Sequence, residues 1–333
     1  MTLSTDDFRE ALQKAACRAL PAADRIEHLK RLSAGATLET WSFDAIGANA
    51  RWPLILRRSP GGVRAVRTLA LADEASLVRA LRTAGAPVAE VVYTLADEDG
   101  LGDGFMMIRI DGETIPRKIL RDAQFDPIRP QLVGQFAQIA AGLHAVDVAT
   151  LPAALPVSGV RRTLDDLRLR TEALESPHPV FDLAIRWLTD HAPSEVLPAR
   201  LVHGDYRHGN VIIGTDGIRA VLDWEIAHLG DPIEDLAWLC LPPWRFGHLD
   251  LPAGGLGSRE ALLSAYEAAS GQAVDPMRFR FWELLGSLRW GVSCASMLEW
   301  FRSGRNRTVE RAMIVRRASE NEMDMMRLIC ERA

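Results

Sequence analysis

The sequence predicts an α+β fold, with a β-rich first part followed by a mostly helical second part. Between residues 26 and 110, short apolar runs alternate with turns rich in Gly, Pro and Asp, which is typical of antiparallel strands. From about residue 113 onward, apolar residues recur at helical spacing over long segments. A short hairpin pattern at residues 211–222 interrupts these helices. Strands first and helices later indicate the α+β class rather than a regular alternation of the two.

Composition limits the classes of protein that fit this chain. Its 333 residues suffice for two lobes with their own cores, and 48% hydrophobic with 25% charged residues is an ordinary soluble globular balance. The net charge of −5, from 44 acidic and 39 basic residues, gives no general attraction to nucleic acid or to an anionic membrane. We therefore expect neither partner.

Cysteine usage and the N-terminal sequence favour a cytoplasmic location. The 4 cysteines are widely scattered, without the paired spacing of zinc or redox motifs, so we expect reduced thiols. Residues 1–7 lack the basic region and apolar stretch of a signal peptide, and no apolar run approaches membrane-spanning length.

Each element of the first part follows from a local pattern. Apolar residues at helical spacing predict a helix over residues 5–20, with Ser4 or Thr5 as its N-cap. A second helical pattern covers residues 64–84 and ends at Gly85. Strand-like runs predict strands at residues 26–32, about 38–43, 53–58, 91–95 and 105–110.

The second part is predicted to be a series of amphipathic helices. Their apolar stripes place them at about residues 132–143, 163–175, 181–191, 235–240, 259–269, 278–303 and 308–331. Methionines and tryptophans recur at helical spacing in the last two, which is typical of core positions.

Three polar residues around the hairpin form the main candidate site. Apolar runs at residues 211–213 and 218–222 flank a turn at 215–217, which predicts the hairpin itself. Because a hairpin brings its outer ends side by side, the side-chain oxygens of Asn210 and Asp223 can converge. Asp205 lies on the loop that leads into the first strand. A carboxylate, an amide oxygen and a second carboxylate are thus gathered at one open edge.

This set of residues suits phosphoryl transfer. In such reactions one Asp orients the acceptor hydroxyl and accepts its proton, while Asn and another Asp hold magnesium on the phosphates. We assign the first role to Asp205 and the metal-binding role to Asn210 and Asp223. Asp and Asn beside Gly are also common turn residues, but here the spacing and the hairpin agree with the catalytic interpretation.

Two motifs resemble the aminoglycoside phosphotransferase and choline kinase family, a relative of the protein kinases. They are His203-Gly204-Asp205 followed by Asn210, and Asp223-Trp224-Glu225 followed by the segment 230–237. The resemblance covers about residues 25–300. It implies a bilobal protein-kinase-like fold with ATP and Mg²⁺ as cofactors and a small-molecule hydroxyl as acceptor. The nucleotide-binding lobe would span residues 1–111, and the catalytic and acceptor-binding lobe residues 112–333.

The resemblance also implies roles for residues near these motifs. Glu225 would assist a second metal ion or a ligating water. Asp235 would support the catalytic loop from the N-terminus of its helix, and His203 would orient backbone. His144 is interpreted as a structural residue from its type and placement.

In the first lobe the resemblance implies a phosphate-binding cation. Arg57 fits the family's Leu-x-Leu-Lys/Arg pattern, and alternation along the strand sends Arg58 to the opposite face. Glu74 in the next helix would be the partner of Arg57. The alternative for the two arginines is a solvated strand end.

Gly35 and Ala36 lie in a turn whose backbone N–H groups would cover the phosphates. The turn has one glycine where a protein kinase loop has three. The alternative is that the turn is a plain connector.

The adenine site is expected at the hinge between the lobes. In the family, the hinge is the segment just before an Asp-Gly pair, which here is Asp111-Gly112. The residues assigned by this rule are Ile108, Arg109 and Ile110, with Met107 behind the base.

Three functions remain open at this point. They are a small-molecule O-kinase, an aminoglycoside O-phosphotransferase and a nucleotide-binding pseudokinase, of which the intact Asp205, Asn210 and Asp223 set disfavours the last. Aminoglycosides are polycations and need an acidic groove, whereas the C-terminal helices are rich in arginine. The arginines are Arg245, Arg289, Arg302, Arg305, Arg307, Arg316 and Arg317. If some of them face the cleft, an anionic acceptor is favoured.

Two further segments refine the expected acceptor. Residues 56–62 and 235–240 resemble the branch of the family found beside, or fused to, acyl-CoA dehydrogenases, which includes kinases of hydroxyacyl-CoA. Trp244 and Arg245 lie in a loop flanked by Pro and Gly, and they are candidates for an acceptor pocket. The alternative is that the arginines are ordinary solvated side chains.

Overall fold

A computed structural model describes residues 4–34, 38–59, 61, 68–194, 197–304 and 307–330 of the chain. The chain divides into two compact units. The first contains Met1–Thr114, Val146–Leu155 and Asn210–Ala227, and the second contains Ile115–Ala145, Pro156–Gly209 and His228–Ala333. The hairpin that carries Asn210 and Asp223 therefore belongs to the first unit, although the expected lobe boundary at residues 111/112 grouped it with the second.

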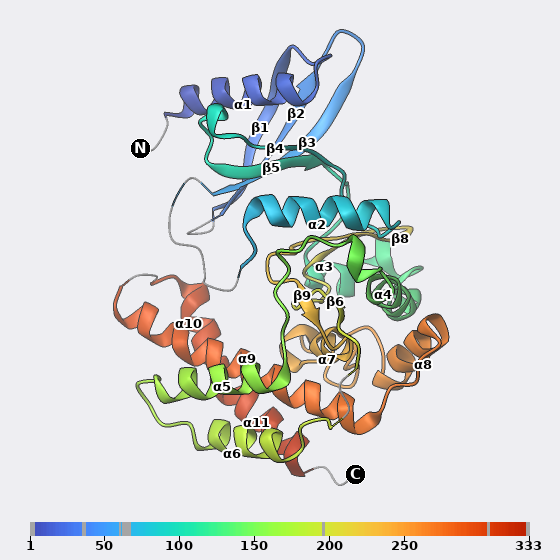
Figure 1. Cartoon of the computed structure of the whole chain (residues 1–333), viewed down its shortest axis with the longest axis vertical. Helices are drawn as coiled ribbons and strands as arrows, with labels where there is room; N and C mark the ends of the chain where they lie inside the picture. Colours follow the sequence, from blue (N-terminus) through green and yellow to red (C-terminus); the bar gives the residue numbers. More distant parts are fainter. Residues whose placement is uncertain are drawn as a thin grey trace. The chain divides into compact units, whose positions relative to one another are not determined.

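A five-stranded antiparallel sheet with the order β1-β2-β3-β5-β4 frames the first unit (Figure 1). Its strands are β1 Arg25–Ala34, β2 Glu39–Ile46, β3 Arg51–Ser59, β4 Val91–Thr94 and β5 Asp103–Ile108. A 3₁₀ turn, η1 (Asp97–Asp99), lies between the last two. The sheet confirms the strands expected in the first part of the chain and, with the helical second unit, the α+β class.

Two helices use opposite faces of this sheet. Helix α1 (Thr5–Ala19) begins at the N-cap Ser4, whose hydroxyl accepts the N–H of Asp7 at 3.2 Å, and it buries its apolar stripe against Leu54 and Leu56. Successive side chains of a strand alternate between faces, so Arg57 points to the other side, toward helix α2 (Leu71–Thr83). The expected start of α2 at residue 64 lies outside the described residues, and the helix begins at Leu71.

The predicted hairpin is present in the first unit. Strand β7 (Val211–Gly214) pairs antiparallel with β8 (Gly217–Val221). The N–H of Leu222 donates to the carbonyl of Asn210 at 2.8 Å, so the outer ends of the hairpin lie side by side as expected. The N–H of Glu113 donates to the carbonyl of Ile213 at 2.9 Å, which ties the hairpin to the rest of the unit.

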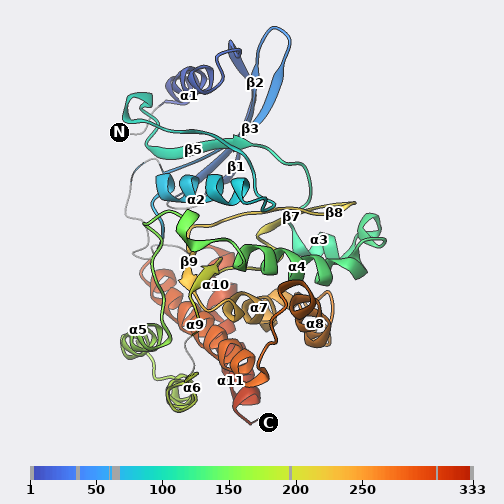
Figure 2. The ribbon, with the colours of Figure 1, turned by 45° about the vertical axis from the view of Figure 1, so that its right-hand side comes forward.

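The second unit is mostly helical (Figure 2). Its α-helices are α3 Pro116–Arg121, α4 Arg129–His144, α5 Val160–Glu172, α6 Pro179–Asp190, α7 Ile233–Leu239, α8 Arg259–Ser270, α9 Pro276–Arg302, α10 Val309–Val315 and α11 Arg317–Cys330. Strands β6 (Arg200–Val202) and β9 (His228–Gly230) form a small antiparallel pair. Short 3₁₀ turns are η2 Ala123–Phe125, η3 Val148–Thr150 (in the first unit) and η4 Pro242–Arg245.

The long helix α9 packs against α7, α6 and α11. One expectation for this unit is wrong: the single helix expected over residues 308–331 is two helices, α10 and α11, because the chain turns at Arg316 between them. In the parts of the chain that the structure describes, no helix is both long and apolar enough to span a membrane.

Candidate active site

Arg57 is the centre of a charged cluster in the first unit. Its guanidinium Nη2 lies 2.6 Å from Oδ1 of Asp223 and 3.4 Å from Oε2 of Glu225. Its Nε lies 3.5 Å from Oε1 of Glu74 on α2. Strand β3, helix α2 and the end of the hairpin thus bring together the four residues that the sequence placed at the phosphate and metal sites.

Burial gives this cluster its electrostatic character. The side chains of Arg57 and Glu74 are 15% and 2% exposed, whereas those of Asp223 and Glu225 are 34% and 31% exposed. Burial disfavours the charge of Arg57, but the carboxylates of Glu74 and Asp223, and then Glu225, outweigh it and raise the pKa of the guanidinium. Glu74 therefore anchors the arginine from the buried side, and Asp223 and Glu225 face the more open side.

The backbone of Asp223 is held in an unusual conformation. Its φ of 64° lies in the left-handed region, which a residue other than glycine enters at a cost of about 1–3 kcal/mol. Neighbouring contacts keep it there: Leu222 bonds to the carbonyl of Asn210, and the carbonyl of Glu225 accepts the N–H of Leu69 at 2.7 Å. Strain of this kind is concentrated at functional sites, and here it falls on the residue whose carboxylate contacts Arg57.

The donor atoms of this cluster fit a magnesium ion that is shared with phosphates. Among the described residues no group of three or more His, Cys, Asp or Glu side chains is arranged to hold a metal alone. Asp223 and Glu225 nevertheless lie within reach of one guanidinium nitrogen, and Asn210 directly precedes β7, with its carbonyl bonded to Leu222. Mg²⁺ in nucleotide sites is bound by one or two carboxylates plus phosphate oxygens, so this small oxygen set is sufficient.

The residues expected to form the hinge lie at and just beyond the end of strand β5 in the first unit. The N–H of Ile108 donates to the carbonyl of Glu90 at 2.8 Å, and the N–H of Arg109 donates to that of Pro53 at 2.9 Å. These two donors are therefore engaged within the protein, and an adenine base would need Ile110 or a carbonyl group. The Arg109 side chain is also engaged, with its guanidinium 3.1 Å from Asp44. Met107 is half-buried on β5.

In the second unit, the loop that carries Asp205 is anchored by Asp235 at the start of α7. The carboxylate of Asp235 accepts the N–H groups of His203 at 2.8 Å and Gly204 at 2.9 Å. His144 places its Nε2 3.2 Å from the same carboxylate and its Nδ1 2.9 Å from the hydroxyl of Tyr266. Asp235 and His144 thus take the supporting positions that the sequence indicated.

Burial alone would raise the pKa of Asp235, because the carboxylate is removed from water. The hydrogen bond and charge of His144, together with His203, outweigh this effect and lower the pKa. Asp235 is therefore a buried anion whose hydrogen bonds hold the backbone of the catalytic loop.

Asp205 itself is held by two side chains that the sequence did not single out. Nε of Arg207 donates to Oδ1 of Asp205 at 2.9 Å, and the indole Nε1 of Trp238 donates to the same oxygen at 2.7 Å. The N–H of Asp205 donates to Nδ1 of His203 at 3.2 Å. The contact of Arg207 could have been predicted, because Arg207 lies only two residues after Asp205. The contact of Trp238 could not, because it depends on how α7 packs.

The expectation for Trp244 and Arg245 needs correction. Trp244 is 8% exposed and packs against Trp238 and Trp290. Arg245 donates from Nη2 to the carbonyl of Cys240 at 2.7 Å and lies 3.5 Å from the buried Glu283. Trp244 thus fills an aromatic cluster, and Arg245 supplies a partner for polar groups buried in the second unit.

Two other arginines that were considered for the cleft form ion pairs within the protein. Arg289 lies 2.5 Å from Glu234, and Arg302 lies 2.6 Å from Glu175. Gly35, Ala36 and Arg305 lie outside the described residues.

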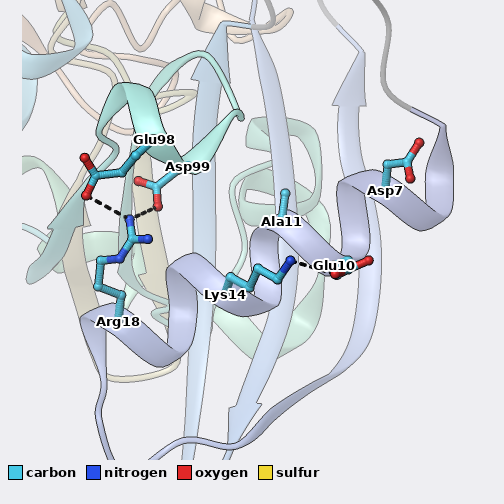
Figure 3. Close-up of a pocket in the computed structure, with 7 residues that line it drawn as sticks. All are labelled: Asp7, Glu10, Ala11, Lys14, Arg18, Glu98 and Asp99. Carbon is cyan, nitrogen blue, oxygen red and sulfur yellow. Dashed lines mark hydrogen bonds and ion pairs between the residues drawn. The ribbon is translucent and has the colours of Figure 1, made fainter.

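A separate hollow of about 250 Å³ lies between α1 and η1 in the first unit (Figure 3). Figure 3 shows Arg18 between Glu98 and Asp99, at 3.4 and 2.5 Å, and Lys14 beside Glu10 at 2.6 Å. Helix α1 covers the sheet face opposite Arg57, so this hollow is distinct from the charged cluster. Its lining has more acidic than basic side chains, with Asp7, Glu10, Glu98 and Asp99 against Lys14 and Arg18.

Comparison with known proteins agrees with the geometry. The model of the phosphotransferase enzyme family matches residues 28–280. Mouse acyl-CoA dehydrogenase family member 10 is 31% identical over 198 residues, which are 56% of this chain and 18% of that protein. The chain thus spans less than a third of the length of this relative.

Solved structures show the same fold. A Ralstonia eutropha protein whose suggested role is aminoglycoside phosphotransferase superimposes with a TM-score of 0.74 and 20% identity, covering 97% of this chain and 99% of that one. A mutant aminoglycoside phosphotransferase in complex with ADP and hygromycin B gives a TM-score of 0.67 with 17% identity, covering 97% and 100% of the two chains.

Proposed function

Because the chain belongs to the phosphotransferase enzyme family, we propose that it transfers the γ-phosphoryl group of ATP to a hydroxyl of a small molecule. The observation that carries this proposal is the cluster in which Arg57 joins Glu74, Asp223 and Glu225. The phosphates of a nucleotide require a positive charge, which the buried Arg57 supplies. Their cation requires negative charges, which the more exposed carboxylates of Asp223 and Glu225 supply.

Each side chain has a distinct part in this mechanism. Arg57 would grip oxygens of the α- and β-phosphates, since a guanidinium can bind two oxygens at once. Asp223, Asn210 and Glu225 would hold Mg²⁺, which supplies charge neutralisation on the phosphates. Asp205 would orient the acceptor hydroxyl and accept its proton, and this positioning accounts for much of the rate enhancement in phosphoryl transfer.

The nucleotide would be held by the first part of the chain. We propose residues 1–111 as the nucleotide-binding lobe and residues 112–333 as the lobe that supplies Asp205 and the acceptor site. The segment 210–227, which contains the hairpin, would add its metal ligands to the nucleotide-binding lobe. The segment from Met107 to Ile110 would lie along the adenine. Such an enzyme would use cytoplasmic ATP.

For the acceptor we favour a hydroxyacyl-CoA or a related anionic metabolite. The support is the similarity to a protein named acyl-CoA dehydrogenase family member 10, because a shared ancestor with a polypeptide of acyl-CoA metabolism favours an acceptor of that chemistry. A second candidate is an aminoglycoside, since a structural neighbour was solved with hygromycin B.

A phosphate-transfer screen tests these proposals. Purified protein with Mg²⁺ and ATP is incubated with hydroxyacyl-CoAs, amino alcohols, sugars and aminoglycosides, and phosphorylated products are identified by mass spectrometry. We expect product from a hydroxyacyl-CoA, with Asp205→Asn as the inactive control. Efficient phosphorylation of kanamycin-like polycations alone would refute the anionic acceptor and favour the second candidate.

A further inference from the structure

The indole of Trp238 makes a short hydrogen bond to the carboxylate of Asp205. It donates from Nε1 to Oδ1 at 2.7 Å, and Nε of Arg207 donates to that same oxygen at 2.9 Å. Trp238 is 5% exposed, so its N–H has little access to water. Two donors that converge on one oxygen restrict the rotation of the carboxylate, because turning it away breaks both bonds.

Trp238 is itself held in place by a cation and by a second ring. The guanidinium carbon of Arg289 lies 4.0 Å from the centre of the Trp238 ring, and its Nη2 donates to the carbonyl of Gly204 at 2.8 Å. The rings of Trp238 and Trp244 are 5.8 Å apart, and Arg207 lies 4.6 Å from the centre of the Trp244 ring. The indole therefore has contacts other than its bond to Asp205 that hold its direction.

We propose that Trp238 is a positioning residue for the phosphoryl-transfer reaction, which holds the Asp205 carboxylate in the orientation that meets the acceptor hydroxyl. This inference rests on the proposed function, because it assumes that Asp205 acts on the acceptor. A purely structural Trp238 would contribute only its ring to the core, and phenylalanine would then replace it with little effect. The N–H group separates the two interpretations.

Trp290 provides a matched control for the N–H group. It belongs to the same aromatic cluster, with its ring 5.2 Å from that of Trp244. Within the described residues its Nε1 is buried and has no hydrogen-bond partner. Trp238→Phe and Trp290→Phe therefore remove similar ring volume from one cluster, but only the former removes a hydrogen bond to Asp205.

The first arm of the experiment needs no acceptor. The indole N–H signal of Trp238 is assigned in ¹H–¹⁵N spectra of the full chain as the one lost in Trp238→Phe. In Asp205→Asn the charge of the acceptor oxygen is removed, and we expect this signal to move upfield by more than any other indole signal. An unmoved signal overturns the contact, whether or not any acceptor is phosphorylated.

The second arm uses the acceptor found in the screen. Loss of a hydrogen bond to a charged group predicts that Trp238→Phe lowers kcat about ten- to a hundredfold, while the KM for ATP stays unchanged and Trp290→Phe keeps the wild-type kcat. Equal kcat values for Trp238→Phe and Trp290→Phe overturn the proposal. If no acceptor in the screen is phosphorylated, the proposed function is contradicted. The NMR measurement would still show whether Trp238 donates a hydrogen bond to Asp205.

Discussion

Replacing Asp235 with asparagine should loosen the loop that carries Asp205. Asp235 is 1% exposed, and its two oxygens accept the N–H groups of His203 and Gly204 at 2.8 and 2.9 Å. Asparagine has nearly the same size, but it is neutral and has a single oxygen. One of the two backbone N–H groups would then face an amide NH₂, so that a buried donor loses its partner.

The size of the effect follows from these bonds. A hydrogen bond to a charged group contributes about 1.5–3 kcal/mol and a neutral one about 0.5–1.5 kcal/mol, while a buried unsatisfied group costs about 1–3 kcal/mol. Weakening one bond from the charged to the neutral range costs about 1–1.5 kcal/mol, and leaving the other N–H unsatisfied costs about 1–3 kcal/mol more. The free energy of unfolding should therefore fall by about 2–4.5 kcal/mol, a large fraction of the about 5–15 kcal/mol typical of a folded protein.

The pH dependence has a definite sign. The folded-state pKa of Asp235 is lowered, so the stability that it contributes is present above the unfolded-state pKa of about 3.9 and is lost as pH falls below it. The difference between wild type and Asp235→Asn should therefore be largest near neutral pH and shrink in acid.

Urea denaturation followed by tryptophan fluorescence measures this difference. The matched control is Asp190→Asn, because Asp190 is exposed at the end of α6 and should change the free energy of unfolding by less than about 0.5 kcal/mol. If Asp235→Asn were within about 1 kcal/mol of wild type and kept full turnover, the loop would not depend on this carboxylate.

Three more substitutions test other parts of the structure. Asp223→Ala should abolish the magnesium-dependent part of ATP binding, because Mg²⁺ needs an anionic oxygen there; titration calorimetry with and without Mg²⁺ checks it, and unchanged affinity would place the metal elsewhere. Arg57→Gln should raise the KM for ATP about ten- to a hundredfold through loss of a charge-assisted phosphate contact, whereas Arg57→Lys should recover part of it; equal KM values in all three proteins would contradict the assignment. Burial, and then the charge of Arg207, lowers the pKa of His208 to about 3, so the unfolded chain takes up a proton below pH about 6.5 that the folded chain does not. Wild type should thus lose about 2 kcal/mol more stability than His208→Leu between pH 6.5 and 5, and parallel stability curves would show that His208 is solvated.

The parts of the site that could be predicted depend on local sequence patterns. The hairpin follows from two apolar runs around a turn, and its closure by the Leu222 to Asn210 bond is a consequence of that pairing. Strand alternation separates Arg57 from Arg58, and the family resemblance implied Glu74 as the partner of Arg57, which lies 3.5 Å from it.

The parts that could not be predicted depend on packing between distant segments. Trp238 is 33 residues from Asp205 in the sequence, so no local pattern connects them. A tryptophan at helical spacing is also typical of a core position. Arg245 was expected in an acceptor pocket because it lies in a loop flanked by Pro and Gly. Its guanidinium instead forms an ion pair with the buried carboxylate of Glu283 on α9. Periodicity identifies a helix and its apolar face, but it does not identify which polar group that face will meet.

The central claim is that Asp205 acts on the acceptor and not on the nucleotide. The most direct measurement compares wild type with Asp205→Asn in two assays, product formation followed by ³¹P NMR and ATP binding in Mg²⁺ followed by calorimetry. We predict that turnover falls by at least about two orders of magnitude while the ATP dissociation constant stays within about twofold of wild type. Full turnover in Asp205→Asn, or a loss of ATP binding that accounts for the lost activity, would contradict the assignment.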